Sequence, residues 1–375
     1  MSILVPFLAF LTALIVGAVL IVFSDSSVLA KWAALFSSPG QALSSSWHAI
    51  YTAYHALFSG SLGSGSALSE TIVQATPLIF TGLAVAVGFQ AGLFNIGAEG
   101  QLVMGGLLSA LAAFAFPGLP ALIHLPLALV AGFVGGALWG AIPGLLKART
   151  GAHEVITTIM LNYIALFVFN YLLFTKLYQR PGRTDQISKI VPKAAELPHL
   201  AGANYRLHAG IIVALLVAAG VYWLLNRTTI GFEIRAVGSN PSAARTAGMS
   251  VAGTWILVMM LAGGLAGLAG ANQLLGVQYS LAPGFSANLG FDAIALALLG
   301  RAHPGGVVAA ALLFGMLRSG AIQMQAVTSI PTDIVVVIQA LIIIFIAAPQ
   351  LVRAIYRVKS RRVAGPQMFS KGWGG

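Results

Sequence analysis

The feature that most constrains this chain is a series of apolar stretches, each about 20 residues long, separated by short polar segments. An α-helix needs about 20 apolar residues to cross a bilayer, and in lipid it can pair all its backbone polar groups internally. Only 8% of the 375 residues are charged and 58% are hydrophobic, which excludes an ordinary soluble domain. The sequence therefore predicts an all-α polytopic membrane protein.

The apolar stretches predict about ten transmembrane helices, including broken or half spans, with both termini cytoplasmic. The expected spans are 3–23, 71–116 with an interruption at 88–101, 121–144, 155–177, 207–225, 255–276, 291–321 with a turn at 301–303, and 334–351. Gly132, Gly136, Gly140 and Gly144 recur every four residues and predict a groove for a neighbouring helix. Lys and Arg are more numerous in the segments expected inside, which favours this orientation.

Three regions follow from this pattern. Residues 1–70 are expected to form an N-terminal anchor span and an external amphipathic segment. Residues 71–352 form the membrane core, which contains a cytoplasmic loop at 227–250. Residues 353–375 form a basic cytoplasmic tail that faces anionic membrane lipid.

Several classes of function are excluded. The net charge of +11 is not a nucleic-acid signal, because its densest block is the tail that follows a span. The pattern G-x-x-x-x-G-K-[ST] is absent, and His153-Glu154 lacks the second His of a zinc-protease motif. There is no cysteine, no nucleophile–base pair and no metal-ligand cluster. We therefore expect no enzyme activity, no cofactor and no metal.

The loop 227–250, RTTIGFEIRAVGSNPSAARTAGMS, is a polar island between two long apolar runs. Asn240 can cap a helix N-terminus, Pro241 suits its first position, and Gly248 suits the residue past its end. A short helix is therefore predicted over 241–247. Ala243, Ala244 and Ala247 would give it a small-residue face for packing against a partner, whereas the alternative is a solvated connection.

The stretch GLFNIGAEGQLVMGG, 92–106, carries the strongest site signal inside the membrane. A carboxylate such as Glu99 costs several kcal/mol in lipid unless it is solvated or paired. Asn95 and Gln101 add polar groups and Phe94 adds a flat face. These residues favour either a solute path or a structural lock, and both alternatives stay open.

Two further stretches, HEVITTIMLNYIA at 153–165 and SLAPGFSANLGFDAIALALLGRAHPGG at 280–306, carry weaker signals. Asn162 would face a path or form a hydrogen bond between helices. Phe285 and Phe291, beside Asp292, would stack on a base or simply fill the core.

These stretches and EIRAVGSNPSAARTAGMS, 233–250, resemble ABC-importer permease subunits of the branched-chain amino acid, ribose and nucleoside superfamily. GLFNIGAEGQL is most similar to the nucleoside and simple-sugar branch. The resemblance implies that loop 227–250 docks on an ATPase subunit through Glu233, Arg235, Asn240, Pro241, Ala243, Ala244, Arg245, Ala247 and Gly248. It implies a substrate path at Phe94, Asn95, Glu99, Gln101, Asn162, Phe285, Phe291 and Asp292.

The expected function is therefore translocation of nucleosides or simple sugars across a bacterial inner membrane, driven by ATP hydrolysed on another chain. The implied partners are ABC ATPase subunits, a second permease subunit that is identical or a sister chain, and an external substrate-binding protein. The alternative is an ion-coupled secondary transporter or channel that uses Glu99. The capped inner loop argues against it, because a secondary transporter needs no ATPase dock.

Overall fold

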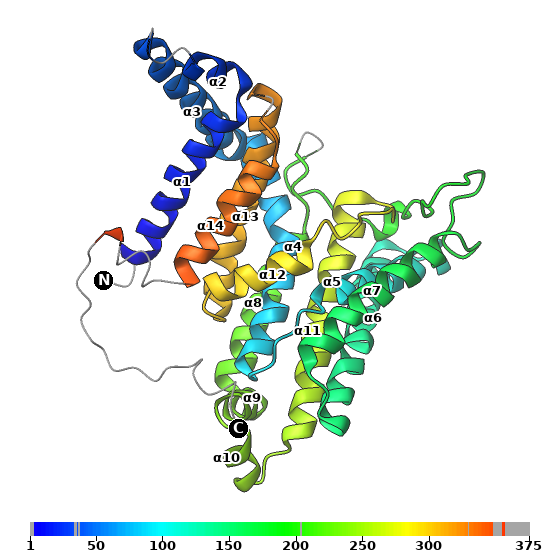
Figure 1. Cartoon of the computed structure of the whole chain (residues 1–375). Coiled ribbons are helices and arrows are strands. Elements are labelled where there is room, and N and C mark those ends of the chain that lie inside the picture. Colours follow the sequence, from blue (N-terminus) through cyan, green and yellow to red (C-terminus); the bar gives the residue numbers. More distant parts are fainter. Residues whose placement is uncertain are drawn as a thin grey trace.

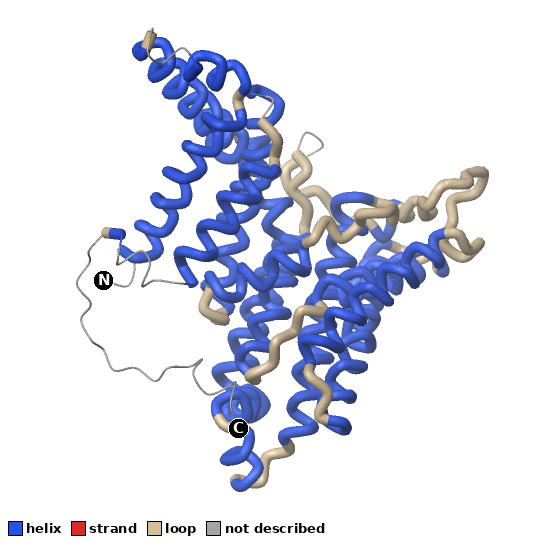
Figure 2. The backbone as a smooth tube through the Cα atoms, viewed as in Figure 1, coloured by secondary structure: helices blue, strands red, loops and turns tan. Residues whose placement is uncertain are grey.

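The structure, a computed structural model, describes residues 4–33, 36, 38–202, 205–328, 330–347 and 355–356. Over these residues the chain is built from helices and connecting loops, with two isolated β-bridges and no strand (Figures 1 and 2). The predicted all-helical class is confirmed. The basic residues expected in the tail lie outside the described residues.

The helices follow one another from residue 4 to residue 347. They are α1 Leu4–Ser24, α2 Ser26–Ala33, α3 Pro39–Leu62, α4 Gly65–Gln90, α5 Ala98–Ala115, α6 Ala121–Thr150, α7 Glu154–Leu173, α8 Gly210–Arg227, α9 Thr229–Ser239, α10 Pro241–Thr246, α11 Val251–Gln273, α12 Leu289–Leu299, α13 Pro304–Thr328 and α14 Asp333–Ala347. A 3₁₀ turn, Lys193–Ala195, precedes α8, and a π-helical turn, Leu274–Gln278, extends α11.

Seven of the described helices are long and apolar enough to cross a membrane: α4 to α8, α11 and α13. An eighth crossing is possible if α1 and α2, which are bent by 79° at their junction, count as one span. The prediction of about ten spans is not confirmed, because α12 has only 11 residues and α14 only 15. The cytoplasmic position of the two termini stays a prediction.

Two large hydrophobic clusters hold most of the helices together. The larger is built around α4, α5, α11 and α12, with α6, α7, α8 and α13 packed against it. The smaller joins α1, α3, α13 and α14, where Leu57, Leu317 and Ile338 are fully buried. Since α13 contributes to both, it connects the N-terminal helices to the rest of the molecule, as Figure 1 shows.

The glycine groove predicted on α6 is confirmed, and α11 fills it. A Cβ added at Gly136 would lie 2.1 Å from the carbonyl oxygen of Gly263, and one at Gly140 would lie 2.3 Å from that of Met259. The two backbones are therefore in direct contact. Such close approach is how helices associate in lipid, where burial of apolar side chains gives no net gain.

The predicted interruption at 88–101 is also confirmed. The long helix α4 ends at Gln90, and α5 begins only at Ala98. Gly92 reverses the chain with φ of +71°, a conformation that glycine adopts without strain. The segment between the two helices then runs back along the bundle, so that α5 starts well inside the molecule (Figure 1).

The long connection between α7 and α8 lies at the end of the molecule opposite α9 and α10 (Figure 1). It is fixed to the end of α11 by backbone pairing. The amides of Ser188, Val191 and Leu197 donate to the carbonyls of Leu281, Tyr279 and Leu275, at 2.8–2.9 Å. This connection is therefore an ordered strap over the C-terminal end of α11.

Candidate functional site

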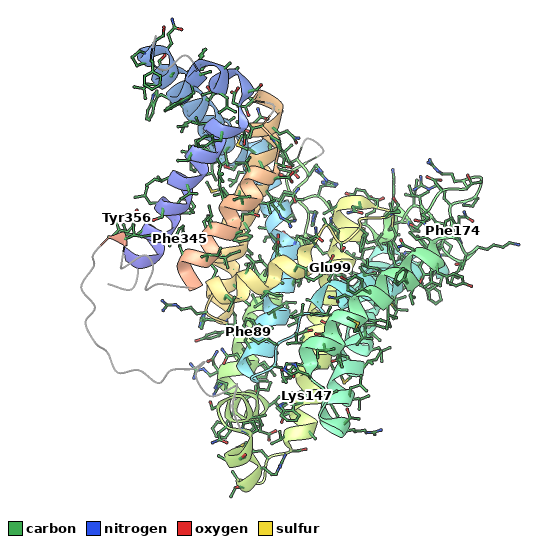
Figure 3. All side chains as sticks on the ribbon, in the orientation of Figure 1. Phe89, Glu99, Lys147, Phe174, Phe345 and Tyr356 are labelled. Carbon is green, nitrogen blue, oxygen red and sulfur yellow. The ribbon has the colours of Figure 1, made fainter. Side chains whose placement is uncertain are left out.

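Glu99 lies in the first turn of α5, near the middle of the molecule (Figure 3), and is 2% exposed. Its Oε2 accepts a hydrogen bond of 2.8 Å from the backbone N–H of Gly290, at the start of α12. The two backbones also touch, because a Cβ at Gly290 would lie 2.2 Å from the amide nitrogen of Glu99. Only glycine fits there, so the beginnings of α5 and α12 are in direct contact. The Glu99 carboxylate links them through its hydrogen bond.

Two helix N-termini meet at this carboxylate. Unpaired N–H groups and the helix dipole make each helix N-terminus partly positive. Glu99 lies at the N-terminus of its own helix and binds that of α12. The structural lock is therefore present in the structure, while a direct role of Glu99 in a solute path stays a prediction.

Asn95 and Gln101 are buried and bind each other. The Asn95 Nδ2 donates to Gln101 Oε1 at 2.8 Å, and Gln101 Nε2 donates back to Asn95 Oδ1 at 3.2 Å. Asn95 Oδ1 also accepts from the amide of Gly97 at 3.0 Å. In this conformation the two amides shape the turn into α5.

Asn162 of α7 holds the same turn from the other side. Its Oδ1 accepts from the amide of Gly100, and its Nδ2 donates to the carbonyl of Ile96, both at 2.9 Å. The alternative of a hydrogen bond between helices is thus observed. Asn162 acts as a clamp on backbone groups that the interruption leaves without helical partners.

The three aromatic candidates fall into two groups. Phe285 is buried and stacks on Phe169 of α7, with ring centroids 6.0 Å apart, so it belongs to the core. Phe94, packed on Phe89 at 4.7 Å, and Phe291 both keep exposed faces. Only Phe94 and Phe291 can therefore offer a ring to a solute in this conformation.

Asp292, in the first turn of α12, pairs with Arg318 of α13. The Arg318 Nη2 lies 2.5 Å from Asp292 Oδ2 and 3.4 Å from the carbonyl oxygen of Ala287. Arg318 was not among the predicted site residues. A single basic residue inside an apolar span was the available signal, because such a charge needs a partner.

The loop 227–250 folds as a helical hairpin of α9 and α10 at one end of the molecule (Figure 1). The short helix predicted over 241–247 is observed as α10, Pro241–Thr246. Asn240 Oδ1 accepts from the amides of Ser242 and Ala243 at 3.0 and 3.1 Å, as a cap should. Gly248 ends the turn with φ of +85°.

The three alanines of α10 do not share one docking face, contrary to our prediction. Ala244 is buried against Val237 and Val251 of its own chain, whereas Ala243 and Ala247 are exposed. The reason is that α10 needs an anchor of its own to stay in place, since two helical turns are not stable alone. Of the charged residues, Arg245 is exposed, while Glu233 and Arg235 are half-buried on α9.

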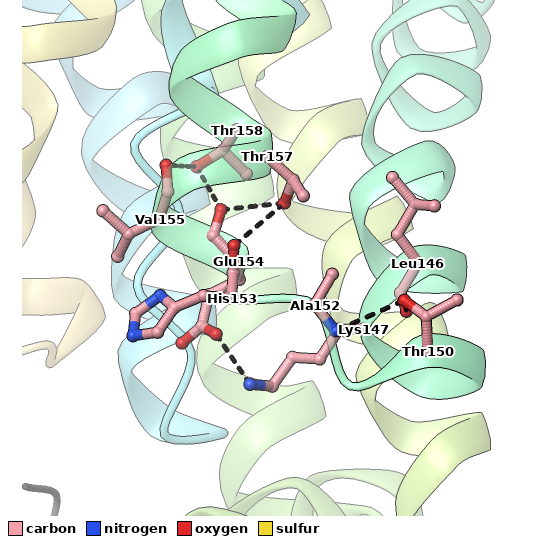
Figure 4. A network of polar contacts seen from close by, with 9 residues as sticks. All are labelled: Leu146, Lys147, Thr150, Ala152, His153, Glu154, Val155, Thr157 and Thr158. Carbon is pink, nitrogen blue, oxygen red and sulfur yellow. Dashed lines mark hydrogen bonds and ion pairs between the residues drawn. The ribbon is translucent and has the colours of Figure 1, made fainter.

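An ion pair lies beside this hairpin, where α6 ends and α7 begins (Figure 4). The Nζ of Lys147 is 2.6 Å from Oε2 of Glu154 and 5.0 Å from the ring centroid of Trp255. Trp255 in turn packs against the cluster of Val237, Ala244 and Val251. The hairpin is therefore joined to α6, α7 and α11 through one set of contacts.

This arrangement indicates a class of protein. A multi-pass helical bundle with an interrupted span is typical of membrane transport proteins. Residues 67–347 match the family described as branched-chain amino acid transport system / permease component. The chain belongs to this permease family.

Several relatives cover most of the chain. It is 44% identical over 309 residues to the Guanosine ABC transporter permease protein NupP of Bacillus subtilis, covering 82% of this chain and 88% of that protein. It is 42% identical to the Nucleoside ABC transporter permease protein NupB of Lactococcus lactis, covering 78% and 82% of the two chains. It is 38% identical to the Glucose ABC transporter permease protein TsgB13 of Haloferax volcanii, covering 82% of each. No solved structure matches the chain.

Proposed function

We propose that this chain is the translocation subunit of an ATP-driven importer for nucleosides or related simple sugars. The observation that carries the proposal is the hairpin of α9 and α10. It is capped by Asn240, anchored by Ala244 and exposed elsewhere on α10, at the end of a bundle that belongs to a permease family. The relatives, which are named as ABC transporter permeases, support ATP coupling over the ion-coupled alternative.

The hairpin suits a coupling element that receives work from a separate ATPase subunit. It is rigid, because both ends of α10 are capped and its buried side is fixed to α9 and α11. Its free surface carries Ala243, Arg245 and Ala247, which allow close approach and offer one positive charge. We assign the docking surface to these exposed residues, with Asn240, Pro241 and Gly248 shaping the helix and Glu233 and Arg235 at its base.

The solute is proposed to be a neutral, hydroxylated molecule that carries a flat ring. Two of the named relatives transport nucleosides, one of them guanosine, and one transports glucose. The exposed rings of Phe94 and Phe291 support the nucleoside choice, since base stacking on an aromatic side chain contributes about 1–3 kcal/mol. Phe94 lies in the interruption between α4 and α5, and Phe291 lies at the start of the short helix α12.

A single subunit leaves much of its surface for other partners. Helices α7 and α8 carry exposed apolar residues such as Phe167, Leu216 and Trp223, which suit lipid or a second permease subunit. We propose a pair of permease subunits, identical or sister chains, with ATPase subunits bound to the exposed surfaces of their hairpins. An external substrate-binding protein would dock near the strap over α11. We propose that the complex lies in a bacterial inner membrane.

Docking can be tested on the exposed face of α10. Ala243→Glu adds a charge that its own subunit does not bury, so folding should be unaffected. We expect normal membrane levels, loss of co-purifying ATPase and loss of uptake. Ala33→Glu, the same change at an exposed site of α2 at the opposite end of the molecule, is the control. If Ala243→Glu retains ATPase and uptake, the hairpin does not dock an ATPase.

A further inference from the structure

An ion pair on the surface of the bundle lies at a depth where lipid is expected. Asp292 and Arg318 are 2.5 Å apart, and their side chains are 29% and 22% exposed. Arg318 lies about 21 Å along α13, a helix of 25 residues that is long enough to cross a bilayer. The pair is therefore far from both ends of that helix.

The backbone beside this pair is irregular. Ala287 and Asn288 adopt left-handed conformations, with φ of +47° and +60°, directly before α12. The carbonyl of Ala287 accepts a hydrogen bond from Arg318. Irregular backbone within the hydrocarbon region occurs only where protein buries it or where it lines a water-filled path.

The same surface carries an aromatic ring. Phe291, adjacent to Asp292 in α12, is 44% exposed. On the other side of the start of α12, Glu99 binds the amide of Gly290. An exposed ion pair, an irregular loop and an exposed ring thus come together at the beginning of one short helix. Charged side chains within membranes face a bundle interior or a water-filled cavity.

We propose that the surface formed by Phe291, Asp292 and Arg318 lines the solute path, and that Arg318 contacts the solute. This inference rests on the proposed import function and adds Arg318 to it. The guanidinium donates hydrogen bonds and the carboxylate accepts them, while their charges cancel. Such a pair suits a neutral hydroxylated solute, and Phe291 offers its ring to a base.

Water access can be measured directly, because this chain contains no cysteine and contributes no background to a single cysteine variant. The assembled complex carrying Phe291→Cys is treated with a charged, membrane-impermeant methanethiosulfonate reagent, with and without guanosine. The rate at which the cysteine is modified is measured. Phe167→Cys is the matched control, since Phe167 on α7 is 73% exposed within an apolar surface. We expect rapid modification of Cys at 291 alone, slowed by guanosine.

The outcomes separate this inference from the proposed function. No modification at 291 would show that lipid or protein covers the surface, and it would overturn the inference even if the complex imports nucleosides. Modification without protection by guanosine, in a complex that imports guanosine, would place the water-filled surface outside the path and would also overturn it. A wild-type complex that imports no nucleoside or sugar would instead refute the proposed function.

The contact of Arg318 with the solute needs a second measurement. Asp292→Asn combined with Arg318→Gln removes both charges and leaves none unpaired. We expect this variant to assemble and to show a KM for uptake raised about tenfold or more, the effect of losing one good polar contact. An unchanged KM would mean that the pair only holds α12 against α13, and Arg318 would be removed from the path.

Discussion

Gly238 of α9 lies directly against the backbone of Gln90, the last residue of α4. A Cβ at position 238 would come within 2.1 Å of the Gln90 carbonyl oxygen, and the neighbouring Gly92 faces the carbonyl of Gly238. The hairpin thus touches the start of the interruption that leads to Asn95 and Glu99. A movement of α9 would reach the turn into α5 through this contact.

Gly238→Ala should therefore weaken the coupling between the hairpin of α9 and α10 and the turn before α5. The added methyl group must push α9 away from α4, whereas the exposed face of α10 stays intact. We expect ATPase subunits still to co-purify and the amount of solute imported per ATP hydrolysed to fall. Gly220→Ala on α8, where a Cβ meets nothing within 4 Å, should behave like the wild type. An unchanged ratio in Gly238→Ala would refute a coupling role for the contact.

Substitutions of Glu99 separate its two possible roles. Glu99→Gln retains an oxygen that can accept from the Gly290 amide, so the complex should assemble while uptake falls if the carboxylate acts on the path. Glu99→Ala leaves that buried amide unpaired and should destabilise the subunit by about 1–3 kcal/mol. Normal uptake by Glu99→Gln would leave Glu99 as a structural lock only.

Asn162→Ala should loosen the turn before α5. The change leaves the buried amide of Gly100 and the part-buried carbonyl of Ile96 without their partners, and the buried amide alone should cost about 1–3 kcal/mol. The midpoint of thermal unfolding in detergent should fall clearly. Asn226→Ala, which removes an exposed hydrogen bond to Tyr222, is the control and should shift it little. Equal shifts in the two variants would contradict the clamp.

The strap between α7 and α8 should make stability depend on pH through His208. Burial, with smaller contributions from His199 and Arg206, lowers the pKa of His208 from 6.5 to about 4. Between these values the unfolded chain binds a proton that the folded chain does not. Stability should therefore be complete above about pH 6.5 and fall, by up to about 3 kcal/mol, as the pH decreases to 4.

Thermal unfolding followed from pH 7 to pH 4 would measure this dependence. His208→Asn removes the titrating ring, so its unfolding midpoint should change less over the same range. An identical pH dependence in the variant and the wild type would assign the effect to other groups.

The features that the sequence predicted correctly are local in the chain. The cap at Asn240 and the turn at Gly248 involve residues only a few positions apart, so both can be recognised from the local amino-acid sequence. The interruption near Gly92 and the glycine groove on α6 depend likewise on neighbouring residues or on one helical period.

The features that it missed depend on distant partners. Glu99 and Gly290 are separated by 191 positions, and no local pattern indicates that the carboxylate binds that amide. The pair of Asp292 and Arg318, and the burial of Ala244 against Val237, also need the packed structure. The count of about ten spans is not confirmed for another reason, because it included half spans such as α12, which is too short to cross a membrane by itself.

Uptake into proteoliposomes that contain the complete complex tests the central claim most directly. With the binding protein outside and the ATPase side accessible to ATP, radiolabelled guanosine should accumulate only when ATP is hydrolysed. Ionophores that collapse proton and sodium gradients should leave the rate unchanged, and excess leucine should not compete. Accumulation driven by an ion gradient without ATP would contradict the account, because the hairpin of α9 and α10 would then not couple transport to an ATPase subunit.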